Sequence, residues 1–239
     1  MSGIFHSFKK SLGKGDARPD MDFIDAKARF DQYQEVLLKL KGNVANYLTH
    51  AVALFVSSSQ ITQDFGTLLE DPERDTHEYT ELSQSMRQEH QSLSHDQVAK
   101  LQHAFSTTLL SEIDAECVRN SELSKRVARR IEVFGELGYY QKKVNELRDE
   151  RNARANKGKT ESASDQEKFE RNQKKLAEFE VTFAEINSKL MADLRQVWDS
   201  QRIVKMGPLL VRFLQQERKL ADGYAAALAN IKEKGFVTP

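Results

Sequence analysis

The sequence predicts an all-α fold, an elongated antiparallel three-helix coiled coil, and three observations support this prediction. Charged residues make up 30% of the 239 residues and hydrophobic residues only 39%, a balance that suits long, water-facing helices better than one thick core. No proline, the residue that interrupts helices, occurs between Pro72 and Pro208. Apolar residues recur every seven positions over two long stretches, as they do in coiled coils.

The first predicted helix covers about residues 20–69. Two series of positions, each with a spacing of seven, start at Phe23 and Ala26 and are apolar everywhere except at Ser58. This pattern places both series on one helix face that packs against other helices. The helix should end before Pro72, because proline cannot continue a helix and favours an extended conformation in the preceding residue.

The second predicted helix covers about residues 77–154. Its apolar period weakens over residues 110–122, and Gly135 and Gly138 lie three positions apart. We expect a bend or a close helix contact at one of these two places. The small and polar residues that follow, about 155–165, predict a loop, here called the tip loop.

The third predicted helix covers about residues 166–235. A spacing of seven returns from Phe169 to Val197, and Gly207 followed by Pro208 should kink the helix. Three helices of this length leave apolar seams that a single chain does not cover. A second copy of the chain would cover them most simply, so the pattern predicts a homodimer.

Residues 1–18 have the pattern of an amphipathic segment that inserts into a membrane. At about 100° per residue, four apolar side chains share one arc: Ile4, Phe5, Phe8 and Leu12. Three lysines fall outside this arc: Lys9, Lys10 and Lys14. Such a segment folds on contact with lipid. Two alternatives remain open, namely that the apolar residues dock on the helices or that the segment is disordered.

Charge is unevenly distributed, although 36 basic and 36 acidic residues cancel. Residues 60–118 contain 3 basic and 12 acidic residues (−9), whereas residues 119–159 contain 12 basic and 6 acidic residues (+6). Each basic residue near an anionic membrane contributes about 1 kcal/mol of salt-sensitive binding. The residues predicted to do so are Arg119, Arg126, Arg129, Arg130, Lys142, Lys143, Arg148, Arg151, Arg154, Lys157 and Lys159. For any single residue, an ordinary solvated helix face is the competing interpretation.

The motifs of catalysis and of cofactor binding are missing from the sequence. No Glu-x-x-His pair, phosphate-binding loop or zinc motif is present, and the single cysteine, Cys117, excludes an internal disulfide. We therefore expect no enzymatic activity, no metal and no cofactor. The balanced charge and the lack of a groove-reading motif argue against nucleic-acid binding. No apolar run reaches the roughly 20 residues of a membrane span, which favours a cytoplasmic protein at the membrane periphery.

Two stretches resemble the N-BAR domains of amphiphysin, endophilin and the fungal Rvs proteins. Residues 126–147, RVARRIEVFGELGYYQKKVNEL, resemble a block with a basic opening, an aromatic centre and a basic pair. Residues 179–202 resemble the third helix of that family, with matches at Phe183, Asn187, Leu190, Leu194, Trp198 and Arg202. Arg195 stands where the family often has proline.

The resemblance implies a crescent-shaped six-helix homodimer, in which residues 19–239 form the BAR domain. It places Arg126, Arg129 and Arg130 near a concave face. It places at the tips, against anionic phospholipid, Arg148, Arg151, Arg154, Lys157 and Lys159. The implied function is to sense or generate membrane curvature in endocytosis or membrane trafficking, with actin and endocytic proteins as further partners. The alternative is a coiled-coil scaffold or cytoskeletal adaptor that does not bind lipid directly.

Overall fold

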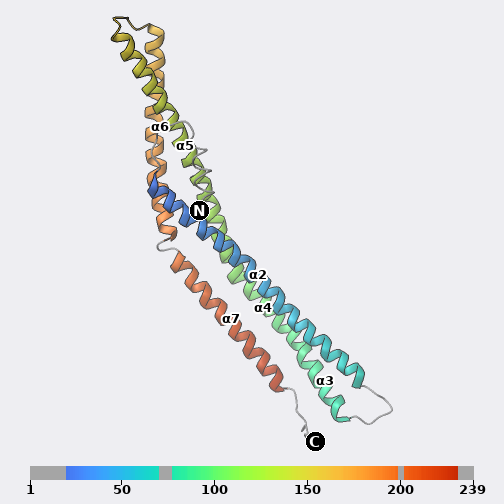
Figure 1. Ribbon diagram of the computed structural model, residues 1–239. Helices are drawn as coiled ribbons and strands as arrows, with labels where there is room; N and C mark the ends of the chain where they lie inside the picture. Colours follow the sequence, from blue (N-terminus) through green and yellow to red (C-terminus); the bar gives the residue numbers. More distant parts are fainter. Residues whose placement is uncertain (1–19, 70–76, 199–201, 231–239) are drawn as a thin grey trace. The chain divides into compact units, whose positions relative to one another are not determined.

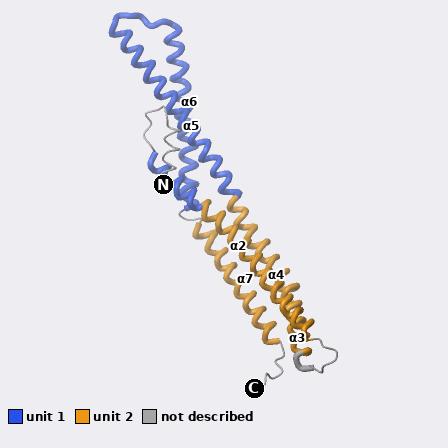
Figure 2. Tube along the Cα trace, turned by 45° about the vertical axis from the view of Figure 1, so that its right-hand side comes forward, with its two compact units in different colours: residues 1–33, 118–200 blue, residues 34–117, 201–239 orange. Residues whose placement is uncertain are grey.

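The computed structural model describes residues 20–69, 77–198 and 202–230. All regular structure in these ranges is helical, which confirms the predicted all-α fold (Figure 1). The chain divides into two compact units, which Figure 2 colours blue and orange. The first unit comprises residues 1–33 and 118–200, and the second comprises residues 34–117 and 201–239. The predicted inserting segment, residues 1–18, lies outside the described residues.

Helix α2 (Met21–Leu69) corresponds to the first predicted helix and contributes residues to both units. Asp20 caps its start, because the Asp20 Oδ1 atom accepts a hydrogen bond from the backbone N–H of Phe23 at 3.1 Å. Such a cap satisfies one of the backbone donors that the first turn of a helix leaves without an internal partner. Phe23 itself is fully buried in the first unit.

The second predicted helix consists of five consecutive helical segments. They are α3 (His77–Ser92), the π-helical η1 (Leu93–Gln97), α4 (Val98–Ala104), the π-helical η2 (Phe105–Leu110) and α5 (Ser111–Ala155). The irregular turns therefore lie before most of the predicted stretch 110–122. Helix α5 runs through Gly135 and Gly138 without interruption, and a Cβ atom at Gly135 would meet no atom within 4 Å.

The π turns explain why the apolar period loses its spacing of seven. Four buried side chains follow one another at intervals of four residues: Leu101, Phe105, Leu109 and Ile113. In a regular α-helix three such steps would rotate the side chains by about 120° away from the core. A π turn holds more residues than an α turn, so it takes up this rotation and keeps all four side chains on the buried side.

Two clusters of apolar side chains form the core of the second unit. The larger contains Leu37, Val44, Leu101, Phe105, Leu109, Ile113 and Leu209, and the smaller contains Phe55, Leu93, Val98 and Ala227. Aromatic rings strengthen the larger cluster, since Tyr47 stacks on Phe105 at 5.5 Å between centroids and meets Phe213 edge-on at 5.3 Å. Helices α2, α4 and α7 (Arg202–Asn230) thereby hold together.

In the first unit, α5 and α6 (Ala163–Gln196) form an antiparallel hairpin (Figure 1). Gly158, with φ of 67°, ends α5 in a turn that only glycine adopts readily. Three hydrogen bonds close this turn. The Arg154 carbonyl accepts the N–H groups of Lys157 at 3.0 Å and Lys159 at 3.1 Å, and the Ala155 carbonyl accepts the Gly158 N–H at 3.0 Å. Ser162 caps α6 by accepting the N–H of Asp165 at 3.1 Å, so α6 starts three residues before the predicted start at 166.

The third predicted helix corresponds to α6 and α7, and residues 199–201 between them lie outside the described residues. Pro208 lies inside α7, and the helix continues on both sides of it. Proline removes the hydrogen bond to the carbonyl four residues earlier, that of Val204. Val204 is 70% exposed, so water can reach this carbonyl region and replace the lost donor.

Candidate lipid-binding surface

The predicted electrostatic residues of α5 lie on the surface of the first unit, with the exception of Arg130. The predicted inserting side chains and the three N-terminal lysines lie outside the described residues: Ile4, Phe5, Phe8, Leu12, Lys9, Lys10 and Lys14. Arg119 is exposed near the start of the first unit's part of α5. The contacts of each remaining basic side chain determine how readily that side chain can bind a lipid phosphate.

Arg130 is buried, so the prediction that it contacts lipid is wrong. Its side chain is 0% exposed, and its guanidinium carbon lies 3.7 Å from the centroid of the Phe23 ring and 4.9 Å from that of Phe183. The Nη2 atom donates to Asp20 Oδ2 at 2.5 Å, and Nε donates to Asn187 Oδ1 at 3.0 Å. Burial lowers the pKa of this guanidinium, whereas the Asp20 carboxylate raises it.

The position of Arg130 in the apolar period explains its burial. Leu123 and Val127 precede it at intervals of four and three residues, and both are buried against the other helices of the first unit. Arg130 continues this series, so its side chain points into the helix interface. A count of charges along the sequence does not predict the burial of Arg130, whereas its heptad position does.

Arg126 and Arg129 are exposed but engaged in ion pairs. Arg126 bonds to Asp193 of α6 at 2.5 Å, and Arg129 bonds to Glu132 at 2.6 Å. Exposed ion pairs contribute about 0–1 kcal/mol, so a lipid phosphate can compete with either carboxylate. Both arginines therefore remain available to an anionic surface, although each must exchange its partner.

Arg151 and Arg154 tie the tip loop to the hairpin. Arg151 bonds to Glu161 at 2.9 Å and lies 5.4 Å from the centroid of the Phe169 ring. Arg154 bonds to Asp165 at the start of α6 and to Glu150 at 3.6 Å. The hydrogen bond from Ser162, followed by the contact with Arg154, lowers the pKa of Asp165. These two arginines hold the tip in shape in addition to carrying charge.

The remaining basic residues near the tip have weaker or no acidic partners. Lys142 bonds to Glu146 at 3.8 Å, and Lys143 donates to the Tyr139 hydroxyl at 3.0 Å. Across the described ranges, Arg148, Lys157 and Lys159 are exposed and form no ion pair. Their charge is therefore not neutralised by a carboxylate.

Helix α6 supplies three further cations that the sequence interpretation missed. They are exposed and, among the described residues, form no ion pair: Lys168, Arg171 and Lys174. Neighbouring glutamates cancelled the charge of these three residues in the net charge of the segment. Their spacing of three, which places them on one side of a helix, would have indicated a basic surface. The contact between Arg151 and Phe169 places this part of α6 beside the distal end of α5. We call the set of Arg148, Lys157, Lys159, Lys168, Arg171 and Lys174 the tip cations.

The second unit exposes two apolar stripes. The stripe on α2 lies within an arc of about 80° in helical projection and adjoins the buried face. It consists of Val36, Leu40, Leu54, Ile61, Phe65 and Leu68, which are between 37% and 79% exposed. The stripe on α7 consists of Ile203, Val204, Leu210, Val211, Leu214 and Leu228. Four heptad core positions of α2 (Leu54, Ile61, Phe65 and Leu68) are thus more than half exposed to solvent in a single chain.

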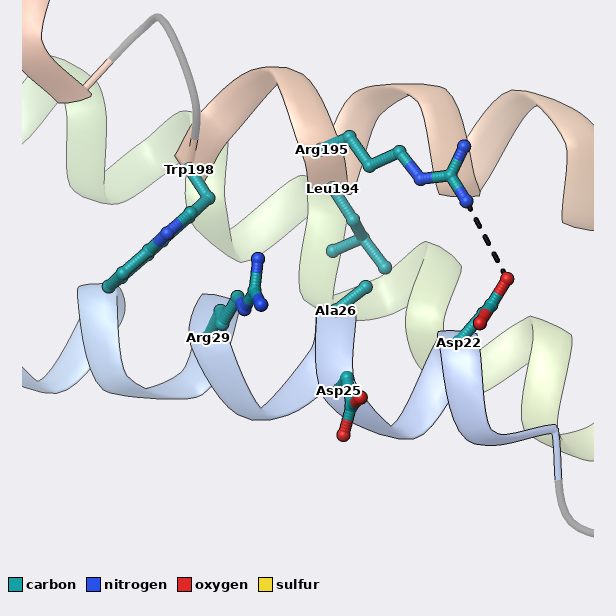
Figure 3. Close-up of a pocket in the computed structure, with 7 residues that line it drawn as sticks. All are labelled: Asp22, Asp25, Ala26, Arg29, Leu194, Arg195 and Trp198. Atoms are coloured by element: carbon teal, nitrogen blue, oxygen red, sulfur yellow. Dashed lines mark ion pairs between the residues drawn. The ribbon is translucent and has the colours of Figure 1, made fainter.

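A cavity of about 200 Å³ lies between α2 and the end of α6 in the first unit (Figure 3). The Trp198 indole extends towards α2 beside Arg29, and Leu194 faces Ala26. On the other side of the cavity Arg195 forms a loose ion pair with Asp22 at 3.8 Å. The charges that line the cavity balance one another, so it offers no strong preference for a cation or an anion.

The described residues contain no group of three or more His, Cys, Asp or Glu side chains arranged to hold a metal ion. None of the helices they form has an apolar stretch long enough to cross a membrane.

Comparisons with known proteins find similar folds among solved structures and no similar sequence. No family model matches the chain, and no curated protein gives a significant sequence match. The amphiphysin BAR domain from Drosophila superimposes with a TM-score of 0.68 at 18% identity, over 90% of this chain and 91% of that chain. A BAR protein from Galdieria sulphuraria superimposes with a TM-score of 0.59 at 15% identity, over 90% of this chain and 97% of that chain.

Proposed function

We propose that this chain, which has the fold of BAR domains, binds anionic membranes as a homodimer and senses or generates their curvature. The observation that carries the proposal is the group of tip cations, none of which forms an ion pair among the described residues, although Lys168 lies within electrostatic reach of Asp165. The BAR fold adds the expectation that such charges serve a membrane surface. The proposed role is non-enzymatic and belongs to endocytosis or membrane trafficking on the cytoplasmic side of a membrane.

Electrostatic attraction supplies the first part of the mechanism. Each tip cation near an anionic bilayer contributes about 1 kcal/mol within a Debye length of about 8–10 Å. Two copies of the chain engage the membrane together, so the second copy binds at a high effective concentration. Binding should therefore weaken as the salt concentration rises.

The apolar stripes of the second unit supply the dimer in this proposal. Leucine and isoleucine side chains each contribute about 1.5–3 kcal/mol when an interface buries them completely. The α2 stripe continues the heptad positions of a coiled coil, so the surface suits another helix of the same kind. A second copy of the chain offers such helices in equal number, and a twofold arrangement covers both stripes at once.

Insertion of residues 1–18 completes the mechanism that we propose. Burial of Ile4, Phe5, Phe8 and Leu12 among the headgroups of one leaflet expands that leaflet and bends the membrane. Their lysine neighbours on the other face remain with the phosphates.

Co-sedimentation with vesicles tests the proposal. Vesicles that contain phosphatidylserine should pellet the protein and form tubules under the electron microscope, whereas neutral phosphatidylcholine vesicles should do neither. Lys157→Glu with Lys159→Glu should weaken binding by roughly tenfold or more. The matched control is Lys100→Glu with Lys219→Glu, which makes the same charge change in the second unit and should bind as the wild type does.

Phe5→Glu should preserve much of the binding and abolish tubulation, because it removes insertion but not the tip charge. Binding that is equal on neutral and anionic vesicles would overturn the electrostatic mechanism. A folded dimer that binds neither kind of vesicle would favour the alternative function, a coiled-coil scaffold that does not contact lipid.

A further inference from the structure

The carboxylate of Asp20 performs two tasks at once. Its Oδ1 atom accepts the Phe23 N–H at 3.1 Å and caps α2, while its Oδ2 atom accepts Arg130 Nη2 at 2.5 Å. Arg130 also donates to Asn187 of α6 at 3.0 Å. Arg130 of α5 therefore contacts both the residue that caps α2 and a residue of α6. Asp20, Arg130 and Asn187 all belong to the first unit.

The surroundings make the Arg130 side of this connection hard to exchange for water, whereas the Asp20 side chain is 30% exposed. The Arg130 guanidinium lies over the Phe23 ring at 3.7 Å and near the rings of Phe183 and Phe134 at 4.9 and 5.1 Å. Its Nη1 atom is buried and has no hydrogen-bond acceptor. A buried cation depends on its counter-ion, and Asp20 is the carboxylate that meets it.

The nearby contact between Asp22 and Arg195 cannot serve the same purpose. Its atoms are 3.8 Å apart, and the two side chains are 81% and 64% exposed. An exposed pair of this kind forms and breaks readily. Beyond the packing of the buried Phe23 ring, the polar hold on the start of α2 therefore depends on Asp20 and Arg130.

Asp20 directly follows residues 1–19 in the sequence. The first turn of a helix ordinarily frays, which would absorb a pull from the preceding segment. We propose that Asp20, Arg130 and Asn187 form an anchor that transmits insertion of the N-terminal segment to α5 and α6, so that Arg130 is a positioning residue for membrane curvature. This inference rests on the proposed function, since it requires that the segment insert into a membrane.

Hydrogen exchange without lipid tests the anchor itself. The two contacts of Asp20 use different oxygens, and Asn at position 20 has one acceptor oxygen and a donating NH2 group, so Asp20→Asn cannot keep both contacts in their present geometry. Amides in residues 21–30 should then exchange roughly tenfold faster or more, because the first turns of α2 open. The matched control, Asp22→Asn, removes the same charge two residues away and should exchange as the wild type does. Equal exchange in Asp20→Asn and the wild type would show that no anchor exists.

Tubulation of phosphatidylserine vesicles tests the coupling. A double variant, Asp20→Asn with Arg130→Met, replaces the buried cation with an apolar side chain that packs well among aromatic rings. It should melt within about 5 °C of the wild type and bind vesicles within roughly twofold, while tubulation falls by roughly fivefold or more. A fold defect alone would not separate binding from tubulation in this way.

Two outcomes overturn the inference while leaving the proposed function intact. The first is wild-type tubulation by the double variant despite faster exchange in α2. The second is a large loss of thermal stability in the double variant, which would make the cluster a folding element. If the wild type itself does not tubulate vesicles, the proposed function fails and the coupling fails with it, whereas the exchange data still show whether the anchor exists.

Discussion

Glu116 lies at the junction between the acidic and basic stretches, and it forms an ion pair that links two helices. Its side chain is 2% exposed and bonds to Lys205 of α7 at 2.9 Å. The acidic residues nearby pair in the same manner, Glu112 with Arg212 and Asp114 with Lys41. The first turns of α5 are therefore tied to α2 and α7, and these acidic residues stabilise the second unit.

The Glu116 pair predicts unequal costs for two lysine substitutions. Lys205→Met leaves Glu116 buried without this partner and should reduce the free energy of unfolding by about 3 kcal/mol. Lys41→Met disrupts a pair whose members are 46% and 48% exposed, so it should cost about 1 kcal/mol or less. Urea denaturation of both variants measures the difference, and equal losses would contradict the role assigned to Glu116.

Asp165 predicts a stability of the tip that depends on pH. Its pKa is lower in the folded chain than its usual value of 3.8, chiefly because Ser162 hydrogen-bonds to the carboxylate. The folded state therefore favours the charged form, and this stabilisation is complete above pH 3.8 and is lost as the pH falls through the lower, folded pKa. Hydrogen exchange near Ala163 should increase on acidification in the wild type.

Asp165→Asn should exchange faster than the wild type at neutral pH and should show a weaker dependence on acid. If the wild type and the variant respond identically to acid, another carboxylate controls the tip. Ser162→Ala should exchange at least as fast as Asp165→Asn at neutral pH, because it removes both the hydrogen bond to the Asp165 carboxylate and the cap on the Asp165 N–H.

At the scale of elements, each of the π turns η1 and η2 is equivalent to an α-helical turn into which one extra residue has been inserted. Removal of one residue from η2 should convert it to an ordinary α-helix and leave the helices on both sides in place. We therefore expect deletion of the exposed residue Thr107 to preserve the fold and to change the melting temperature by about 5 °C or less. Deletion of the exposed Ala128 in α5 should be far more damaging, because it rotates the following buried residues by about 100°.

Circular dichroism melts of the two deletion variants measure this contrast. If deletion of Thr107 unfolds the second unit, the π turn is required for packing and is more than an accommodated insertion. If both deletions are tolerated, the period of the helices is less restrictive than the buried series from Leu101 to Ile113 indicates.

The sequence supports prediction of the helices better than prediction of what the charged side chains contact. The heptad positions from Phe23 onward and the break near Pro72 follow from local chemistry, so they identify α2. The π turns do not, because a single extra residue leaves only a blurred period in the sequence. The contacts of Arg130 and the ion pair of Arg126 depend on residues far away in the chain, which no count of nearby charges includes.

At the scale of the whole molecule, the apolar stripes predict that the protein associates. Ile61→Glu with Phe65→Glu places two charges in the α2 stripe and should give a monomer with unchanged helix content. Val56→Glu is the control, because Val56 is also exposed, at 44%, but lies on the opposite side of α2 at about 160° from Leu40. Analytical ultracentrifugation distinguishes the two species. A wild-type monomer, or a dimer in the double variant, would contradict the proposed interface.

The cavity beside Trp198 has a practical consequence for spectroscopy. Trp198 is the single tryptophan of the chain, and its indole extends towards the first turns of α2 (Figure 3). Its fluorescence emission therefore reports on one place in the protein. Departure of α2 from α6 would expose the indole to water and shift the emission to longer wavelength, so an unlabelled protein can be followed in real time as it meets a vesicle.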